Sequence, residues 1–175
     1  MTPAPDTADS SYGEDVSPHR ILVRAATRAD LPIVLELRLA LLQEHGDSLI
    51  YRRLRPDARE RARELFGNQL ASPYEVTLLA EMEGHVVGIL RCVESKGMPL
   101  LYPSRYAYIS SVYVVPHARR SGVVRALLAQ ATSWCEARGL TEMRLHNAAE
   151  NAAANATWHA LGFEIVEHLR VRQLR

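Results

Sequence analysis

A strand, a turn and a helix are encoded in the stretch Ser110-Ser111-Val112-Tyr113-Val114-Val115-Pro116-His117-Ala118-Arg119-Arg120-Ser121-Gly122-Val123-Val124-Arg125-Ala126-Leu127-Leu128. Its apolar pattern predicts a strand over residues 106–115 and a helix over residues 122–138. Backbone N–H groups at a helix start carry partial positive charge, so the turn between them favours an anion, most often phosphate. An ordinary strand-to-helix turn with solvated arginines is the alternative reading of this segment alone.

The segments on either side of this stretch alternate between strand and helix patterns. Glu83-Gly84 separates two apolar runs and indicates a hairpin. The order predicts an α/β (α+β) fold, with a mixed sheet and helices on both faces. The further strands are expected at 21–25, 75–81, 85–93, 142–146, 163–166 and 169–174, and the further helices at 30–46, 56–70 and 151–161.

Length and charge indicate one ordinary globular domain. The chain has 175 residues, of which 47% are hydrophobic and 23% charged, and its net charge is +1. We therefore expect a single domain over residues 20–175, preceded by a disordered acidic tail over residues 1–19. A net charge of +1 gives no overall field that favours nucleic acid or an anionic membrane surface.

The two cysteines and the N-terminal segment bear on cellular location. Cys92 and Cys135 have no metal-ligand spacing and are expected to be buried free thiols, which fits a reducing compartment. The first residues lack the basic and apolar regions of a signal peptide, and no apolar run has the length of a membrane span. A cytoplasmic location is the default expectation.

A second informative segment is Asn151-Ala152-Ala153-Ala154-Asn155-Ala156-Thr157-Trp158-His159-Ala160-Leu161-Gly162-Phe163. Together the two segments resemble the Gcn5-related N-acetyltransferase (GNAT) superfamily. The acetyl-CoA loop of that family has the form Arg-x-x-Gly-x-Gly/Ala, and this chain departs from it only at the last position. The family's next helix is matched as well, with a tryptophan in place of its usual tyrosine. The matching residues are Arg119, Gly122, Asn151, Ala154, Gly162 and Phe163, and the departures are Val124 and Trp158.

The resemblance implies acetyl-CoA as cosubstrate and a mostly antiparallel sheet with a central, splayed pair of parallel strands. The pantetheine arm would lie in the gap between those strands and pair with the backbone of Val114 and Val115. Amides from Arg120 to Val124 (Arg120, Ser121, Gly122, Val123 and Val124) would take the pyrophosphate. Arg119 or Arg120 would add positive charge. Asn151 would bond the cofactor arm, with a plain N-cap as the alternative.

The implied reaction is direct attack of a primary amine on the acetyl thioester in a ternary complex, with a backbone N–H near Val114 as donor to the thioester oxygen. Many relatives carry a glutamate in this strand, whereas this chain has hydroxyls there. Ser110 is a candidate to hold a relaying water, and Tyr113 is a second candidate by position, as is Tyr108. Trp158 would orient the thioester, with a core aromatic as its alternative. His117 and His146 are expected to be non-catalytic.

The acceptor amine is left open by the sequence. Residues 43–55 and 95–105 are the expected specificity loops, and the arginines of the first favour either an acidic acceptor or plain solvation. No metal is expected, because no ligand cluster is visible. A non-catalytic acetyl-CoA sensor of the same fold and an unrelated phosphate-binding module are the alternative functions. A homodimer is compatible with the resemblance, because many relatives dimerise through their C-terminal strands.

Overall fold

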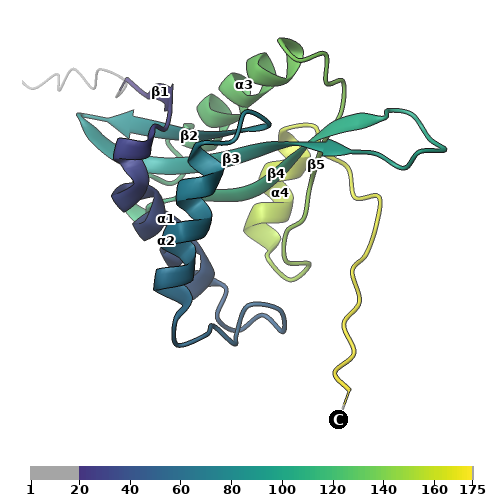
Figure 1. The fold of residues 1–175 in the computed structure, drawn as a ribbon, viewed down its shortest axis with the longest axis horizontal. Helices are drawn as coiled ribbons and strands as arrows, with labels where there is room; N and C mark the ends of the chain where they lie inside the picture. Colours follow the sequence, from purple (N-terminus) through teal and green to yellow (C-terminus); the bar gives the residue numbers. More distant parts are fainter. Residues whose placement is uncertain (1–19, 175) are drawn as a thin grey trace, which may run out of the picture.

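A computed structural model describes residues 20–174 of the chain (Figure 1). Within these residues, five strands form one sheet, and four α-helices and two short 3-10 turns connect them. In chain order the elements are β1 (Leu22–Ala25), η1 (Arg28–Asp30), α1 (Leu31–Glu44), α2 (Ala58–Leu70), β2 (Glu75–Met82), β3 (His85–Lys96), β4 (Arg105–Val114), η2 (Pro116–Ala118), α3 (Val123–Glu136), β5 (Met143–Leu145) and α4 (Ala152–Ala160).

The sheet has the order β1-β2-β3-β4-β5, and all neighbouring strands are antiparallel except β4 and β5, which run parallel. Helices α1 and α2 pack on one face and α3 packs on the other (Figure 1). The predicted mixed sheet with helices on both faces is therefore confirmed. The predicted hairpin at Glu83-Gly84 is also confirmed, because both residues have positive φ and join β2 to β3.

The two faces of the sheet have separate apolar cores. On the α3 face, Leu90, Val123 and Leu127 are almost fully buried, and on the α1/α2 face Leu79 and Ile89 are. A Cβ on Gly88 would come within 2.7 Å of a Val123 methyl carbon, so glycine allows the first turn of α3 to lie directly on β3. This close packing fixes where the N-terminus of α3 lies relative to the strands.

The two cysteines confirm the expectation of buried free thiols. Cys92 on β3 and Cys135 on α3 are both buried, and their sulfur atoms are 3.8 Å apart. The contact with Cys135 and burial together raise the pKa of the Cys92 thiol. No helix among residues 20–174 is long and apolar enough to cross a membrane.

The two predicted C-terminal strands are wrong. Residues 163–174 contain no strand, and in Figure 1 this segment leaves the body of the domain after α4. Phe163 donates its backbone N–H to the Trp158 carbonyl, and no residue after it in the described part of the chain forms a backbone ladder. Alternating apolar and charged residues fit a strand, but a strand requires a partner edge for its hydrogen bonds. The predicted tail over residues 1–19 lies outside the described residues.

A charged network joins β1 to the start of α1. Asp30 is the N-cap residue of α1, but its carboxylate makes no hydrogen bond to the helix and instead accepts hydrogen bonds from the backbone and hydroxyl of Thr27. Arg24 donates to both oxygens of Asp30, at 2.9 and 2.8 Å, and also bonds Glu81 on β2. The hydrogen bonds from Arg24, followed by those from Thr27, hold the pKa of Asp30 well below its usual range.

We expect Asp30→Asn to lower the free energy of unfolding by about 1 kcal/mol at pH 7, because charge-assisted hydrogen bonds are lost. A folded-state pKa below the unfolded value of about 3.9 stabilises the folded protein at pH values above about 3.9. This contribution is lost as the pH falls further. In urea titrations, the difference between wild type and Asp30→Asn should therefore shrink between pH 5 and pH 3. Asp47→Asn is the matched control, because Asp47 makes no hydrogen bond within residues 20–174. A pH-independent difference would contradict the assignment.

Candidate active site

A gap opens in the sheet where β4 and β5 separate. The two strands pair only from Ala107 to Ile109 on β4, and β5 ends at Leu145. A register shift between Arg91 and Cys92 of β3 leaves Ser110 as an extra residue on β4. From Ser110 to Val114, the edge of β4 that faces away from β3 has no strand partner in residues 20–174. The splayed parallel pair implied by the sequence is therefore present. The gap between β4 and β5, called the splay below, leaves this backbone edge of β4 open.

The backbone N–H groups of Val114 and Val115 point to opposite edges of β4. The N–H of Val115 donates to the Val87 carbonyl on β3 at 2.9 Å, so it is not free to pair with a ligand in the gap. Because hydrogen-bonding groups alternate along a strand, the N–H of Val114 points toward the gap. The carbonyl of Val114 accepts from Nε of Arg119 at 3.0 Å. Val114 is thus the better placed of the two predicted backbone partners.

The turn between β4 and α3 presents a run of free amides. Arg120 and Gly122 adopt left-handed conformations, with φ of 63° and 91°. The first helical hydrogen bond runs from Ala126 to Gly122, at 3.0 Å. The six consecutive backbone N–H groups from Arg120 to Arg125 donate to no acceptor within the described residues. Such a run of unpaired donors at a helix N-terminus is a ready anion site. Ser121 supports the turn, because its hydroxyl donates to the Ala118 carbonyl at 2.7 Å.

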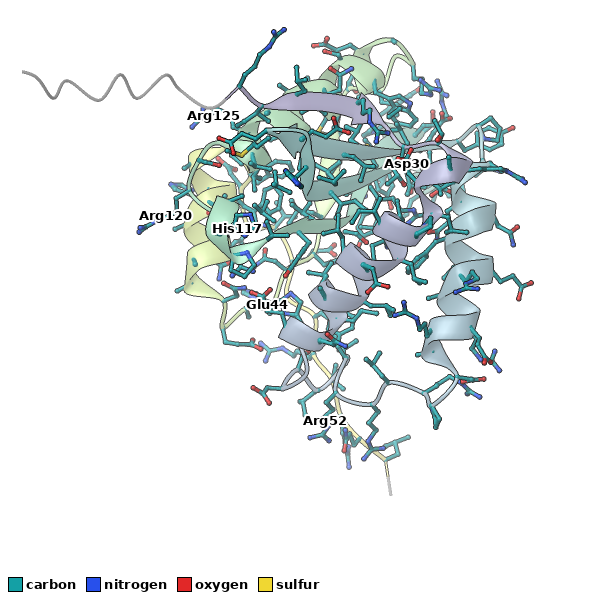
Figure 2. All side chains as sticks on the ribbon, turned by 90° about the vertical axis from the view of Figure 1, so that its left-hand side faces the viewer. Asp30, Glu44, Arg52, His117, Arg120 and Arg125 are labelled. Carbon is teal, nitrogen blue, oxygen red and sulfur yellow. The ribbon has the colours of Figure 1, made fainter. Side chains whose placement is uncertain are left out.

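The two arginines of this turn have different surroundings. Arg119 bonds Glu44 at the end of α1 at 2.7 Å and lies 5.7 Å above the Tyr113 ring, which ties the turn to α1. The hydrogen bond with Glu44 raises the pKa of Arg119. Arg120 is exposed and has no ion pair within residues 20–174, and Figure 2 shows its side chain extending into solvent. Arg120 is therefore the arginine that is free to meet an anion here.

The α4 segment is tied to the loop after β5, because Nδ2 of Asn147 donates to Oδ1 of Asn155 at 2.8 Å. Asn151 is the N-cap of α4, and its Oδ1 accepts from the Ala154 N–H at 3.0 Å, as its alternative reading expected. Its Nδ2 makes no hydrogen bond within residues 20–174 and stays available. Trp158 packs edge-on against Phe163, with 5.3 Å between ring centroids. Val124, the other departure from the motif, is partly buried against the α3-side core.

Sequence reasoning missed one pair of side chains at the splay. The hydroxyl of Tyr108 lies 2.7 Å from Nδ1 of His146, so a side chain on β4 meets one just beyond β5. Burial first, and then the neighbouring phenols of Tyr51 and Tyr106, raise the pKa of Tyr108. Tyr51 lies in the loop between α1 and α2, so that loop is close to this pair. No local pattern reveals a contact between residues 38 positions apart.

The two other predicted catalytic residues lie on the α1/α2 face of the sheet. Ser110 accepts a hydrogen bond from Nη1 of Arg91 at 2.7 Å, which leaves its own hydroxyl hydrogen free to donate. Tyr113 packs against the α1/α2 core, beneath Arg119. The structure thus brings Ser110, Tyr108 and His146 toward the splay, whereas Tyr113 is held closer to α1. Within residues 20–174, no cluster of three or more His, Cys, Asp or Glu side chains could hold a metal ion.

Known proteins with similar sequences and folds agree on one family. The profile of the Acetyltransferase (GNAT) family matches residues 39–163. An aminoglycoside N(6')-acetyltransferase type 1 from Stenotrophomonas maltophilia is 30% identical over 151 residues, which cover 84% of this chain and 88% of the relative. One from Klebsiella aerogenes is 30% identical over 107 residues, covering 61% and 70%. The crystal structure of an aminoglycoside 6'-N-acetyltransferase from Acinetobacter haemolyticus superimposes with a TM-score of 0.70, at 24% identity, over 88% of this chain and 98% of that one.

The splayed strands, the free amides at the start of α3 and the α4 segment define a coenzyme A-dependent acyltransferase fold. The chain belongs to the acetyltransferase (GNAT) family. Its activity class is acetyl-CoA-dependent transfer of the acetyl group to an amine.

Proposed function

We propose that this chain binds acetyl-CoA along the open edge of β4 and passes the acetyl group to a primary amine on the α1/α2 face. The observation that carries this placement is the run of six free amides from Arg120 to Arg125, which lies next to the splay between β4 and β5. The pyrophosphate sits over those amides, with Arg120 adding charge. The pantetheine arm extends along β4 past Val114, and Asn151 donates through Nδ2 from the other side.

Tyr108 and His146 are proposed as the route for the proton that the amine loses. The Tyr108 oxygen accepts a proton from the attacking amine as its own proton passes to Nδ1 of His146. The thioester oxygen is stabilised by the N–H of Val114, and the departing thiolate of coenzyme A takes up a proton from solvent water. Ser110 positions a water beside the amine through its free hydroxyl hydrogen. Trp158 packs near the thioester and orients it.

The named relatives offer one candidate acceptor. They are aminoglycoside N(6')-acetyltransferases, and two of them are 30% identical to this chain over more than half of its length. An aminoglycoside is therefore one acceptor to test beside other primary amines. The non-catalytic sensor is not favoured, because these relatives are named as enzymes.

Two features support proposals on location and assembly. Two buried free thiols fit the cytoplasm, where cysteines stay reduced. β5 is an edge strand, and the C-terminal segment carries exposed apolar side chains, which together favour pairing between two copies of this chain. The exposed apolar residues are Ile165, Val166, Leu169, Val171 and Leu174. Light scattering should give the mass of a dimer, and a monomer at micromolar concentration would contradict the pairing.

Thiol release from acetyl-CoA tests the proposed transfer. Free thiol should appear only when a primary amine is added, and mass spectrometry should find that amine heavier by one acetyl group. An aminoglycoside belongs in the amine panel as the acceptor named in the relatives. Stabilisation of the fold by acetyl-CoA without any amine-dependent thiol release would support the sensor instead.

A further inference from the structure

Two arginines, one on β3 beside the β4 bulge and one on α1, interact on the α1/α2 face of the sheet. Arg91 on β3 forms an ion pair with Glu75 on β2, and these side chains are only 13% and 9% exposed. Nη1 of Arg91 also donates to Ser110 at 2.7 Å, in the bulge where β4 leaves its regular register. Arg38 on α1 interacts electrostatically with both Arg91 and Glu75. The cluster thus connects α1 with the stretch of β4 that borders the splay.

The cluster carries more positive than negative charge. Two guanidinium groups share the single carboxylate of Glu75, and Arg91 holds that carboxylate directly. Arg38 has no carboxylate within ion-pair distance in residues 20–174, and its only hydrogen bond is to the neutral Oε1 of Gln69. Its guanidinium lies 3.6 Å above the Phe66 ring. Burial, followed by repulsion from Arg91, lowers the pKa of Arg38 to about 10, so it remains charged at neutral pH.

Two nitrogens of Arg38 have no hydrogen-bond partner within the described residues. Nε and Nη2 make no hydrogen bond there. No fully buried side-chain nitrogen or oxygen in that part of the chain lacks a hydrogen bond, so neither of these two nitrogens is fully buried. They are the two donors that form one arm of the guanidinium fork, which fits a carboxylate in bidentate geometry. A half-buried cation without a counter-ion is unfavourable unless an anion completes it.

We propose that Arg38, supported by Arg91, binds a carboxylate of the acceptor, so that the substrate is an amine that also carries an anionic group. This inference rests on the proposed function, because it names the acceptor of that same site. A polycationic amino sugar would meet uncompensated positive charge on the acceptor face, so we expect it to be a poorer acceptor than an amine with an anionic group. Arg38 acts here as a specificity residue and takes no part in the proton transfers.

Matched acceptor pairs test the inference. The kcat/KM of the wild type should be about tenfold higher or more for an amino acid than for the corresponding amino-acid amide, with the difference in KM. Arg38→Gln should remove this preference while leaving transfer to the amide within about twofold. Arg38→Lys keeps the charge without the fork and should retain an intermediate preference. Arg63→Gln is the control. Arg63 is an exposed residue of α2, so this variant makes the same charge change away from the cluster.

The outcomes separate the inference from the proposed function. A wild type that acetylates the amide or an aminoglycoside as efficiently as the amino acid would overturn the inference alone. An equal loss for both acceptors in Arg38→Gln, with the melting temperature unchanged, would also overturn it, as would an unaltered preference in both Arg38 variants. If no amine in the panel increased thiol release from acetyl-CoA, both the proposed function and this inference would be overturned. An amino phosphonate in the panel distinguishes recognition of a carboxylate from that of a phosphate-like group.

Discussion

Gly122→Glu should abolish acetyl-CoA binding, with a loss of affinity of roughly 100-fold or more. Gly122 has a φ of 91°, and a Cβ there would meet only a methyl carbon of Ile21, at 3.9 Å. The space for a side chain therefore lies on the open side of the turn. A glutamate would bring a negative charge to the amides from Arg120 to Arg125 and compete with the pyrophosphate.

The control for this variant is Gly139→Glu. Gly139 also has positive φ, at 67°, has no atom near its Cβ position, and lies just beyond the other end of α3. Both variants should lose about 1 kcal/mol of stability from backbone strain. Calorimetric titration with acetyl-CoA should find binding lost only at Gly122. Equal affinities in the two variants would refute the assignment of the turn, and Gly122→Ala separates strain from charge.

Tyr108→Phe and His146→Ala should each lower kcat roughly 100-fold, while the affinity for acetyl-CoA stays unchanged. The raised pKa of Tyr108 keeps its phenol protonated through neutral and mildly alkaline pH, so it can donate to Nδ1 of His146. The charged and titratable groups nearby are Tyr51, Tyr106 and Arg144, whose guanidinium lies 4.0 Å above the Tyr106 ring.

A double-mutant cycle distinguishes a proton route from a structural role. If Tyr108 and His146 pass one proton between them, removing either residue breaks the route, so the kcat of the double variant Tyr108→Phe/His146→Ala should be about equal to that of the slower single variant. Tyr106→Phe is the control, because Tyr106 precedes Tyr108 by two residues on β4 and lacks a contact with His146. A loss of kcat in Tyr106→Phe equal to that in Tyr108→Phe would contradict the relay.

The local elements of this fold could be predicted from the sequence because their signals are local. Periodic apolar residues predict α3, Gly122 predicts the turn before it, and Asn151 predicts the N-cap of α4. The structure has all three. The resemblance added the splay between β4 and β5, which no local pattern contains. The C-terminal strands failed because alternation predicts a strand only when a partner edge is present.

The parts of the site that escaped prediction depend on contacts between distant residues. The sequence motif predicts Arg119 as an anion ligand. In the structure, however, Arg119 is paired with Glu44, 75 positions earlier. Tyr108 and His146 meet only because β4 and β5 pair in parallel up to Ile109 and Leu145. The electrostatic cluster of Arg38, Glu75 and Arg91 joins three separate elements, and its net charge is visible only after the fold brings them together.

The central claim is that the amides before and within the first turn of α3 hold the pyrophosphate of acetyl-CoA. Amide NMR of the uniformly labelled chain, titrated with coenzyme A, tests it most directly. The largest shifts should fall on the N–H groups from Arg120 to Arg125 and on Val114, and they should disappear in Gly122→Glu. Shifts centred instead on the separate pocket of about 510 Å³ between the end of α3 and β5, lined by residues such as Thr132 and Met143, would contradict the claim.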